Sequence, residues 1–159
     1  PWPYTPTDAA SFVALQHAQL FPNALLWTRD GQSPQLVGSC GLGELDGEAE
    51  LGYWIARPFW GRGYATEAAR AVIQAARALG HKKLVSSHFI DNPASGRVLR
   101  KVGFRPTGKT QMRFSAGRGR DVPGLFFERD LADAEIVDMA RVAKITPVPK
   151  QPYCQQFAA

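Results

Sequence analysis

Cysteine and histidine are scarce in this sequence, and their scarcity excludes two classes of site. The 159 residues include two cysteines, Cys40 and Cys154, and three histidines. Two cysteines are too few for a disulfide scaffold, and neither they nor the histidines show metal-ligand spacing. We therefore expect no metal site. Cys40 stands in an apolar stretch and is expected to be buried, whereas Cys154 stands in a polar segment and is expected to be an oxidisable thiol.

Long apolar runs and clustered basic residues are missing as well. No run approaches the roughly 20 residues of a membrane span, and the N-terminus lacks a signal sequence, which predicts a cytoplasmic protein without a membrane partner. The formal charge is +5, but no Lys/Arg tract stands out, so direct nucleic-acid binding is not expected. A polyanionic cofactor is a sufficient partner, although solubility alone also explains most of the 19 cations.

Two glycines stand between an expected strand and an alanine-rich helix. Residues 57–68 read RPFWGRGYATEA, with Gly61 and Gly63 at the turn. Glycine reaches left-handed dihedrals and lets a ligand approach the bare peptide N–H groups. The first turn of the following helix adds unpaired N–H groups and its positive dipole end, which favours an anion such as a diphosphate. Alone, such a glycine pair is equally typical of an ordinary turn.

A second motif makes the glycine turn a more specific signal. Residues 91–104 read DNPASGRVLRKVGF, and residues 52–68 read GYWIARPFWGRGYATEA. Together these motifs resemble the acetyl-CoA-binding core of the GNAT N-acetyltransferase superfamily, closest to the RimJ/RimL branch of ribosomal-protein N-terminal acetyltransferases. The resemblance covers roughly residues 5–130.

The hydrophobic periodicity predicts the following elements. The first element is a helix capped by Thr7 or Asp8, with Phe12, Val13 and Leu15 inward. Three strands follow, at 23–30, 35–43 and 48–56, and Asp46-Gly47 forms a hairpin turn before the third. A helix from Thr66 to Gly80 follows, with Ala69, Val72, Ile73, Ala76 and Leu79 inward and Arg70 and Arg77 outward. Then come a strand at 82–90, a helix capped by Asn92, and strands at 104–114 and 125–131 joined by a loop at 115–124.

The resemblance implies an α+β fold, an α/β/α sandwich. Its mixed, mostly antiparallel sheet splays between two parallel central strands, 48–56 and 82–90, and helices cover both faces. We expect a single acetyltransferase domain over residues 1–133 and a tail over 134–159 that is too rich in proline and polar residues for the core and is a candidate contact in a homodimer. The family's usual first strand is expected to be absent from this sequence.

The resemblance also implies how acetyl-CoA is held. The pantetheine arm inserts between the splayed strands and bonds the backbone near Trp54 and Ile55, whose N–H is the natural oxyanion donor. The backbone from Gly61 to Thr66 holds the diphosphate, which assigns cofactor binding to Gly61, Arg62, Gly63, Tyr64, Ala65 and Thr66. Asn92 caps its helix and can bond the pantetheine arm. Arg57, Arg62, Arg100 or Lys101 can reach the ribose phosphate, although a lone exposed cation is more often just solvated. Tyr64 can also serve only in packing.

Glu50 is the candidate general base. An α-amine has a pKa near 8, so it needs only a modest base, which can act through water. Strand alternation places Glu48, Glu50, Gly52 and Trp54 on one face, so two carboxylates lie on the strand that presents the thioester. A solvated polar face of a half-buried sheet explains the same pattern.

Ser95 is the candidate acid for the leaving thiolate. Many members of the family carry a tyrosine on this helix, but the matching position here is Leu99, and the ribosomal-type branch instead has a serine three residues after the asparagine. A serine in the first turn of a helix is also commonly a capping residue.

Three functions stay open at this stage. The first is acetylation of a protein N-terminal α-amine. The second is acetylation of a small amine such as an aminoglycoside, a polyamine or an amino acid, for which the run Glu44, Asp46, Glu48 and Glu50 is the one candidate acidic groove. The third is a non-catalytic module that only binds acyl-CoA.

Overall fold

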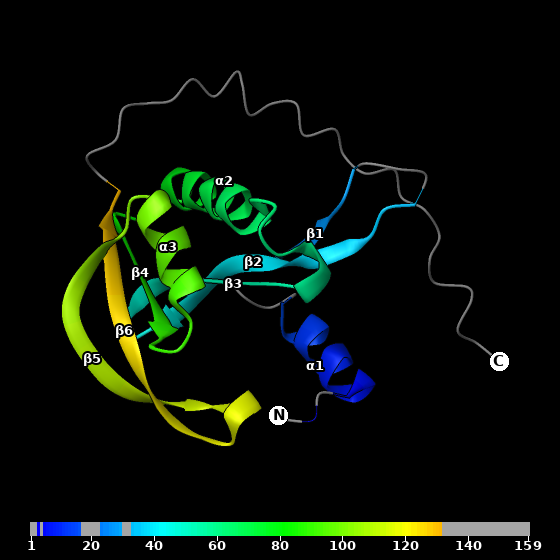
Figure 1. Cartoon of the computed structure of the whole chain (residues 1–159). Helices are drawn as coiled ribbons and strands as arrows, with labels where there is room; N and C mark the ends of the chain where they lie inside the picture. Colours follow the sequence, from blue (N-terminus) through cyan, green and yellow to red (C-terminus); the bar gives the residue numbers. More distant parts are fainter. Residues whose placement is uncertain (1–2, 4, 17–22, 30–32, 132–159) are drawn as a thin grey trace.

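A computed structural model describes residues 3, 5–16, 23–29 and 33–131, which include one six-stranded sheet with two helices, α2 and α3, packed on it (Figure 1). The strand order is β1-β2-β3-β4-β6-β5. The strands are β1 (Asn23–Trp27), β2 (Leu36–Leu45), β3 (Glu48–Ile55), β4 (Lys83–Phe89), β5 (Arg105–Ser115) and β6 (Arg120–Asp130). The helices are α1 (Pro6–Gln16), α2 (Tyr64–Ala78) and α3 (Pro93–Lys101), with short 3-10 turns η1 (Arg57–Phe59) and η2 (Ala116–Arg118).

Among the described strands, one pair of neighbours runs parallel. β3 and β4 are parallel, whereas β1–β2, β2–β3, β4–β6 and β5–β6 are antiparallel. This mixed topology confirms the predicted fold class. The parallel pair lies in the middle of the sheet. The chain crosses from β3 to β4 through α2, as a parallel connection requires.

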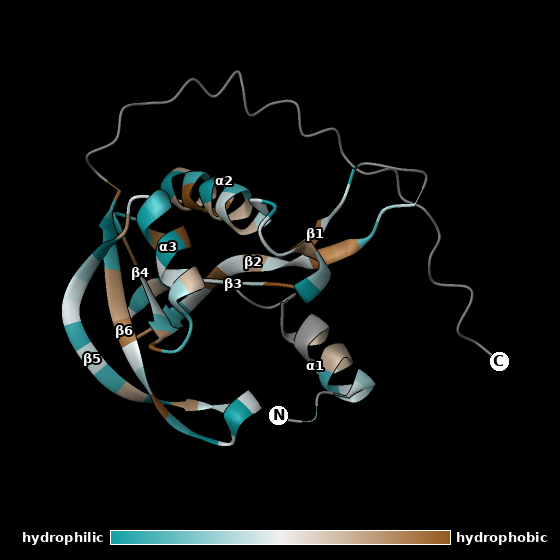
Figure 2. Cartoon of the chain, in the orientation of Figure 1, coloured by the Kyte–Doolittle hydropathy of each residue, from teal (hydrophilic) through white to brown (hydrophobic). Residues whose placement is uncertain are grey.

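The core lies between the sheet and the two helices α2 and α3. Ala69 and Ile73 of α2 and Leu99 of α3 pack with strand residues such as Leu42 and Phe127, and all are at most 2% exposed. Residues of α2 alternate between hydrophilic and hydrophobic colours in Figure 2, as expected for a helix with one apolar face. Figure 1 shows α1 on the other side of β2 and β3 from α2.

Two side chains of α2 differ from the prediction. Leu79, expected inward, is 57% exposed because the helix ends at Ala78 and its C-cap lies beyond the packed face. Arg77, expected outward, is half-buried, and its Nε and Nη2 atoms are covered. The inward positions of Ala69, Ile73 and Ala76 are confirmed, and Gly80 follows the helix with φ +88°.

The N-terminal helix begins earlier than predicted. Thr5, not Thr7 or Asp8, caps α1: its hydroxyl accepts the Asp8 N–H at 3.3 Å, and the Asp8 carboxylate accepts the Thr5 N–H at 2.8 Å. These reciprocal bonds form a capping box, with Pro6 at the first helical position. The Thr5 hydroxyl also donates to the Asp8 carboxylate at 2.6 Å, and this bond together with that from the Thr5 N–H lowers the pKa of Asp8. The predicted inward side chains of Phe12, Val13 and Leu15 lie outside the described residues, as does the tail.

The last hairpin is longer than predicted. The loop expected at 115–124 narrows to η2 and Gly119, because β6 starts at Arg120 and Pro123 pairs with Met112 inside the ladder. The glycine and arginine content of this stretch predicted a loop, but pairing with β5 holds residues 120–124 extended. The first hairpin is as predicted: Asp46 and Gly47 both have positive φ, +52° and +81°, as a two-residue I′ turn requires.

The buried position predicted for Cys40 is confirmed. Its side chain is 1% exposed, and burial raises the pKa of its thiol to about 12, so it stays protonated. Cys154 lies outside the described residues. Within the described part of the chain, no helix is long and apolar enough to cross a membrane.

Candidate functional site

The two parallel strands separate soon after they meet. β3 and β4 share a single registered pair, Glu50 with Val85. One residue further, Ser86 Oγ donates to the Leu51 carbonyl at 2.8 Å. The described strands share no other registered pair on either side of Glu50 and Val85, and toward their C-terminal ends a cavity lined by Tyr53 of β3 and His88 of β4 lies between them. The predicted splay is confirmed.

The opened edge of β3 presents free backbone groups. Ala56 N donates to Val37 O at 2.8 Å, so Ile55 and its partner Gly38 form a non-hydrogen-bonded pair. The N–H and C=O of Ile55 therefore point away from β2, into the opening. Alternation gives Tyr53 the same orientation and turns the peptide groups of Trp54 toward β2.

One of these opened groups already has a partner. The Trp60 indole Nε1 donates to the Ile55 carbonyl at 2.6 Å. The Ile55 N–H and both peptide groups of Tyr53 remain directed at the opening. A single extended chain can bond to them as an added strand does.

The glycine turn after β3 has the conformation that its residues predict. Gly61 and Gly63 have φ +77° and +87°, and a Cβ built on either would meet no atom within 4 Å. Gly63 is the N-cap of α2 and no side chain caps that helix. The Thr66 N–H donates to the Gly63 carbonyl at 3.0 Å, so the N–H groups that precede it and the positive dipole end of this 15-residue helix are the ones directed at the open space. This space fits an anionic group held by backbone alone.

A cavity of about 260 Å³, the gap cavity, lies where the strands separate. Its lining includes Glu50 and Tyr53 of β3, Ser87 and His88 of β4, Ser95 of α3 and Arg113 of β5. Because alternate residues of β3 face opposite sides, Glu50 and Tyr53 approach this cavity from opposite faces of the sheet. The gap cavity therefore connects the helix-covered face with the other one.

A pair of hydroxyl groups lies on the helix side of the gap cavity. Tyr53 Oη lies 2.9 Å from Ser95 Oγ, and either hydroxyl can be the donor of that bond. Tyr53 Oη is also 3.0 Å from the Ser95 carbonyl oxygen, to which it can donate. Burial raises the pKa of Tyr53, against the smaller opposite effect of the Ser95 hydrogen bond. The Ser95 N–H donates to Asn92 Oδ1 at 3.3 Å, which confirms Asn92 as the cap of α3.

A charged cluster lies on the other side of the gap cavity. Arg113 Nη1 donates to Glu50 Oε1 at 2.9 Å and also to Ser87 Oγ, so three strands meet at one guanidinium. The side chains of Arg113 and Glu50 are 34% and 21% exposed. This pairing fixes one carboxylate oxygen of Glu50. The other, Oε2, has no recorded partner among the described residues.

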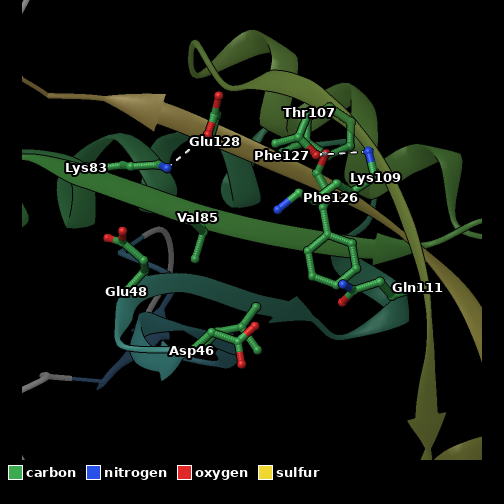
Figure 3. A pocket seen from close by; sticks show the side chains of 11 residues that line it. Asp46, Glu48, Lys83, Val85, Thr107, Lys109, Gln111, Phe126, Phe127 and Glu128 are labelled. Atoms are coloured by element: carbon green, nitrogen blue, oxygen red, sulfur yellow. Dashed lines mark hydrogen bonds and ion pairs between the residues drawn. The ribbon is translucent and has the colours of Figure 1, made fainter.

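A second cavity, the outer cavity, lies further along the same face of the sheet (Figure 3). It measures about 240 Å³, and its charged lining is Asp46, Glu48, Lys83, Lys109 and Glu128. Lys83 is paired with Glu128 at 3.0 Å. Three carboxylates and two ammonium groups leave a formal charge of only −1.

The candidate acidic groove is divided by the sheet. Glu44 pairs with Ala49, which is buried on the helix side, so Glu44 lies on the opposite face from Glu48 and Glu50. Asp46 and Glu48 reach the outer cavity and Glu50 reaches the gap cavity. Four acidic residues therefore do not form one groove.

The other predicted residues lie around the glycine turn or on α3. Arg62 and Tyr64 both contact Phe59, with the Arg62 guanidinium 5.6 Å from the ring centroid and the Tyr64 ring 6.1 Å away, edge-on. The Trp54 side chain is 53% exposed. Arg100 lies over Phe127 at 5.4 Å, and Lys101 is exposed in the last turn of α3. About 9 Å of helix separates Lys101 from Ser95.

The sequence did not identify Tyr53, Ser87, Trp60 or Arg113. Because side chains alternate along β3, Tyr53 shares a face with the buried residues Ala49 and Leu51, and an aromatic residue on such a face is typical of the hydrophobic core. Arg113 comes from a strand 63 residues after Glu50, so no local pattern connects them.

The comparisons with known proteins decide the family. A family model described as "Acetyltransferase (GNAT) domain" matches residues 1–105, about two thirds of the chain. The chain belongs to the GNAT acetyltransferase family. The predicted resemblance is therefore confirmed.

Individual relatives of this GNAT chain match over shorter stretches. The Bacillus subtilis "Uncharacterized N-acetyltransferase YoaA" is 36% identical over 78 residues, which cover 46% of this chain and 44% of YoaA. The B. subtilis "Putative ribosomal N-acetyltransferase YdaF" is 31% identical over 83 residues, covering 52% and 45%. The matched part thus spans less than half the length of these relatives.

Solved structures share the fold. YncA, described as a putative acetyltransferase from Salmonella typhimurium with its cofactor acetyl-CoA, superposes with a TM-score of 0.66 at 18% identity, over 85% of this chain and 79% of YncA. At this identity the likeness concerns the fold. No group of three or more potential metal ligands occurs in the described ranges.

Proposed function

We propose that this GNAT chain is an acetyl-CoA-dependent N-acetyltransferase that moves an acetyl group directly from the thioester to a primary amine. The observation that carries the proposal is the opening between β3 and β4, with backbone groups of Tyr53 and Ile55 directed into it. A pantetheine arm is extended and carries amides, which suits a strand-like position there. The family membership and the acetyl-CoA complex of YncA support the same reading.

The glycine turn then holds the diphosphate. Open space at Gly61 and Gly63 lets backbone N–H groups of residues 61–65 reach phosphate oxygens, with the helix dipole adding to the attraction. The Thr66 N–H, also assigned to the diphosphate from the sequence, donates to the Gly63 carbonyl at 3.0 Å instead. Arg62 or Lys101 would contact the ribose phosphate, and the Asn92 amide the arm. Backbone contact near Trp54 is expected to come from Tyr53 and Ile55, because the peptide groups of Trp54 face β2.

The chemistry requires a base, an oxyanion donor and a route for the thiolate. Glu50 Oε2 accepts the amine proton, directly or through water, while Arg113 holds Oε1. The Ile55 N–H faces the opening and donates to the developing oxyanion. Ser95 lies on the opposite wall of the gap cavity, where a leaving thiolate can be protonated.

A protein N-terminal α-amine is the acceptor we favour. The motif similarity to ribosomal-type enzymes and the match to YdaF support it. A polycationic small molecule would need a strongly acidic groove, whereas the outer cavity carries a formal charge of −1.

The test mixes the full chain with acetyl-CoA and a panel of amines and follows release of free thiol. The panel contains peptides with a free N-terminus and no lysine, their N-acetylated counterparts as matched controls, spermine, kanamycin and free amino acids. Release with free peptides alone supports N-terminal acetylation. Thiol release with spermine, kanamycin or an amino acid alone would show that the acceptor is a small amine and not a protein N-terminus. Acetyl-CoA binding without any release would instead indicate a non-catalytic module.

A further inference from the structure

The pair formed by Tyr53 and Ser95 joins the two walls of the gap cavity. Tyr53 belongs to β3, and Ser95 belongs to the first turn of α3, 42 residues later in the chain. Both line the gap cavity. Leu99, at the position where the family resemblance expects a tyrosine, is fully buried in the core and offers no hydroxyl to this cavity.

The pair has two possible arrangements of its hydrogens. Tyr53 has one hydroxyl hydrogen and two acceptors within reach, Ser95 Oγ at 2.9 Å and the Ser95 carbonyl at 3.0 Å. If Tyr53 donates to the carbonyl, the Ser95 hydroxyl donates back to Tyr53 Oη. If Tyr53 donates to Ser95 Oγ, the hydrogen of Ser95 is free to turn into the gap cavity.

A lone serine is poorly suited to protonate a thiolate. An aliphatic hydroxyl is a weaker acid than a phenol, and a thiol with a pKa near 8.5 is more acidic than either. Proton transfer from Ser95 to sulfur therefore leaves an unstable alkoxide, unless another group supplies a proton to it. Tyr53 is the one hydroxyl recorded within hydrogen-bond distance of Ser95 Oγ in the described part of the chain.

We propose that Tyr53 is the positioning residue for the leaving group: it donates its hydrogen to Ser95 Oγ and so directs the Ser95 hydrogen at the departing sulfur. The inference rests on the proposed function. As the C–S bond breaks, its electron pair stays on sulfur, the Ser95 proton moves to sulfur to give the free thiol of CoA, and the Tyr53 proton moves to Ser95 Oγ. Solvent then returns one proton to Tyr53, which balances the proton that the amine loses to Glu50 and that Glu50 releases to solvent. The strand thereby supplies the phenol that Leu99 lacks.

The experiment compares Tyr53→Phe, Ser95→Ala and the double variant with the wild-type chain in single-turnover acetylation of the best amine of the panel. Removal of a proton-transfer group lowers the rate by roughly 10²-fold or more, so we expect each single variant to lose at least about tenfold. The double variant is expected to be no slower than the slower single variant. Tyr53→Phe keeps the packed ring, and calorimetry checks that acetyl-CoA affinity stays within about threefold.

A selenoester analogue of acetyl-CoA separates this role from a structural one. A selenolate leaves without needing a proton, so both variants are expected to approach the wild-type rate with this donor. Thr28→Val is the matched control, because Thr28 is a buried hydroxyl just after β1 that accepts the Gln35 N–H at 3.0 Å and does not line the gap cavity. It should change stability and not the rate with either donor.

Fluorotyrosine at position 53 provides a second measurement. It retains the ring and hydroxyl, so folding is kept, but it lowers the phenol pKa and should move the alkaline limb of the pH–rate profile to lower pH. Wild-type rates in Tyr53→Phe, or equal losses with thioester and selenoester, would overturn this inference while leaving the proposed function intact. Absence of thiol release from the wild-type chain with every amine would overturn both.

Discussion

Glu50 shows how one carboxylate can be both held and available. Arg113 binds Oε1 at 2.9 Å, and Ser87 Oγ lies 3.4 Å from the same oxygen. A partly exposed ion pair of this kind contributes little stability, about 0–1 kcal/mol. Its effect is geometric, because it holds Oε1 and leaves Oε2 without a partner among the described residues at the wall of the gap cavity.

We predict that Glu50→Gln slows acetylation by about a hundredfold, since a general base contributes roughly 10²–10⁴ in rate. Acetyl-CoA affinity should hardly change, because the Glu50 side chain lies on the face of the sheet opposite α2 and α3, where we propose that the amine binds. Glu48→Gln is the matched control: Glu48 lies two residues earlier on the same face and reaches only the outer cavity. Single-turnover rates and calorimetry on both variants check this. Equal rates in Glu50→Gln and wild type would end the assignment of Glu50 as base.

We predict that Gly63→Val abolishes acetyl-CoA binding in a folded chain. The new Cβ meets no protein atom, so it would occupy the space left for the diphosphate, and its positive φ costs about 1–2 kcal/mol. Gly80→Val carries the same strain, with φ +88° against +87°, at the other end of α2. Calorimetric titration should give no binding for the first variant and wild-type affinity for the second. Binding by Gly63→Val would place the phosphates elsewhere.

At the scale of elements, α3 depends on a glycine that the sequence did not explain. A Cβ on Gly96 would lie 2.5 Å from His88 Nε2, so α3 contacts β4 with no room for a side chain. The His88 ring cannot easily withdraw, because it is 8% exposed, packs on Phe127 at 5.3 Å, and its Nδ1 is bonded to the Phe89 carbonyl.

We therefore predict that Gly96→Ala destabilises the chain by about 1–3 kcal/mol, the range for overpacking. In an ordinary helix the same change would stabilise by about 0.5–1 kcal/mol. Gly117→Ala is the control, since no atom lies within 4 Å of its Cβ position, and its change should stay within about 0.5 kcal/mol. Urea unfolding measures both. A stabilised Gly96→Ala would show that α3 can shift away from β4.

The elements themselves were predictable where a local signal specified them. Asn92-Pro93, Asp46-Gly47 and the glycines at 61 and 63 define caps and turns through their own dihedrals, and all were found as expected. The start of β6 was not, because Pro123 and Gly124 favour a loop locally and only pairing with β5 holds them extended. The inward position of Leu79 failed because periodicity does not report where a helix ends.

The site divides in the same way. The glycine turn, Glu50, Asn92 and Ser95 follow from local motifs and from the family resemblance. Tyr53 and Arg113 do not, because each acts on a residue 42 or 63 positions away and only the topology brings them together. Local sequence thus indicates the groups that we propose to bind the cofactor, while the sheet determines which side chains lie against the proposed acid and base.

For the whole molecule, the sheet consists of two halves that share one backbone pair. One antiparallel half consists of β1, β2 and β3, and the other of β4, β6 and β5. The two halves are joined by the registered pair Glu50–Val85, by the hydrogen bond from Ser86 Oγ to the Leu51 carbonyl, and by the core beneath α2 and α3. A ligand that bonds in the opening would complete the sheet at its weakest point. Local opening should therefore be easiest at this seam in the free chain.

This arrangement makes a residue-specific prediction for hydrogen exchange. The amides of Tyr53 and Ile55 face the opening, whereas the Trp54 amide faces β2 in a hydrogen-bonded pair with Ser39. In the free chain, Tyr53 and Ile55 should exchange much faster than Trp54. Saturating CoA should slow Tyr53 and Ile55 at least about tenfold, which corresponds to about 1.4 kcal/mol of added protection, and leave Trp54 unchanged. Equal slowing of all three would indicate general stabilisation by binding, and no slowing of Tyr53 or Ile55 would mean that the arm does not lie along β3.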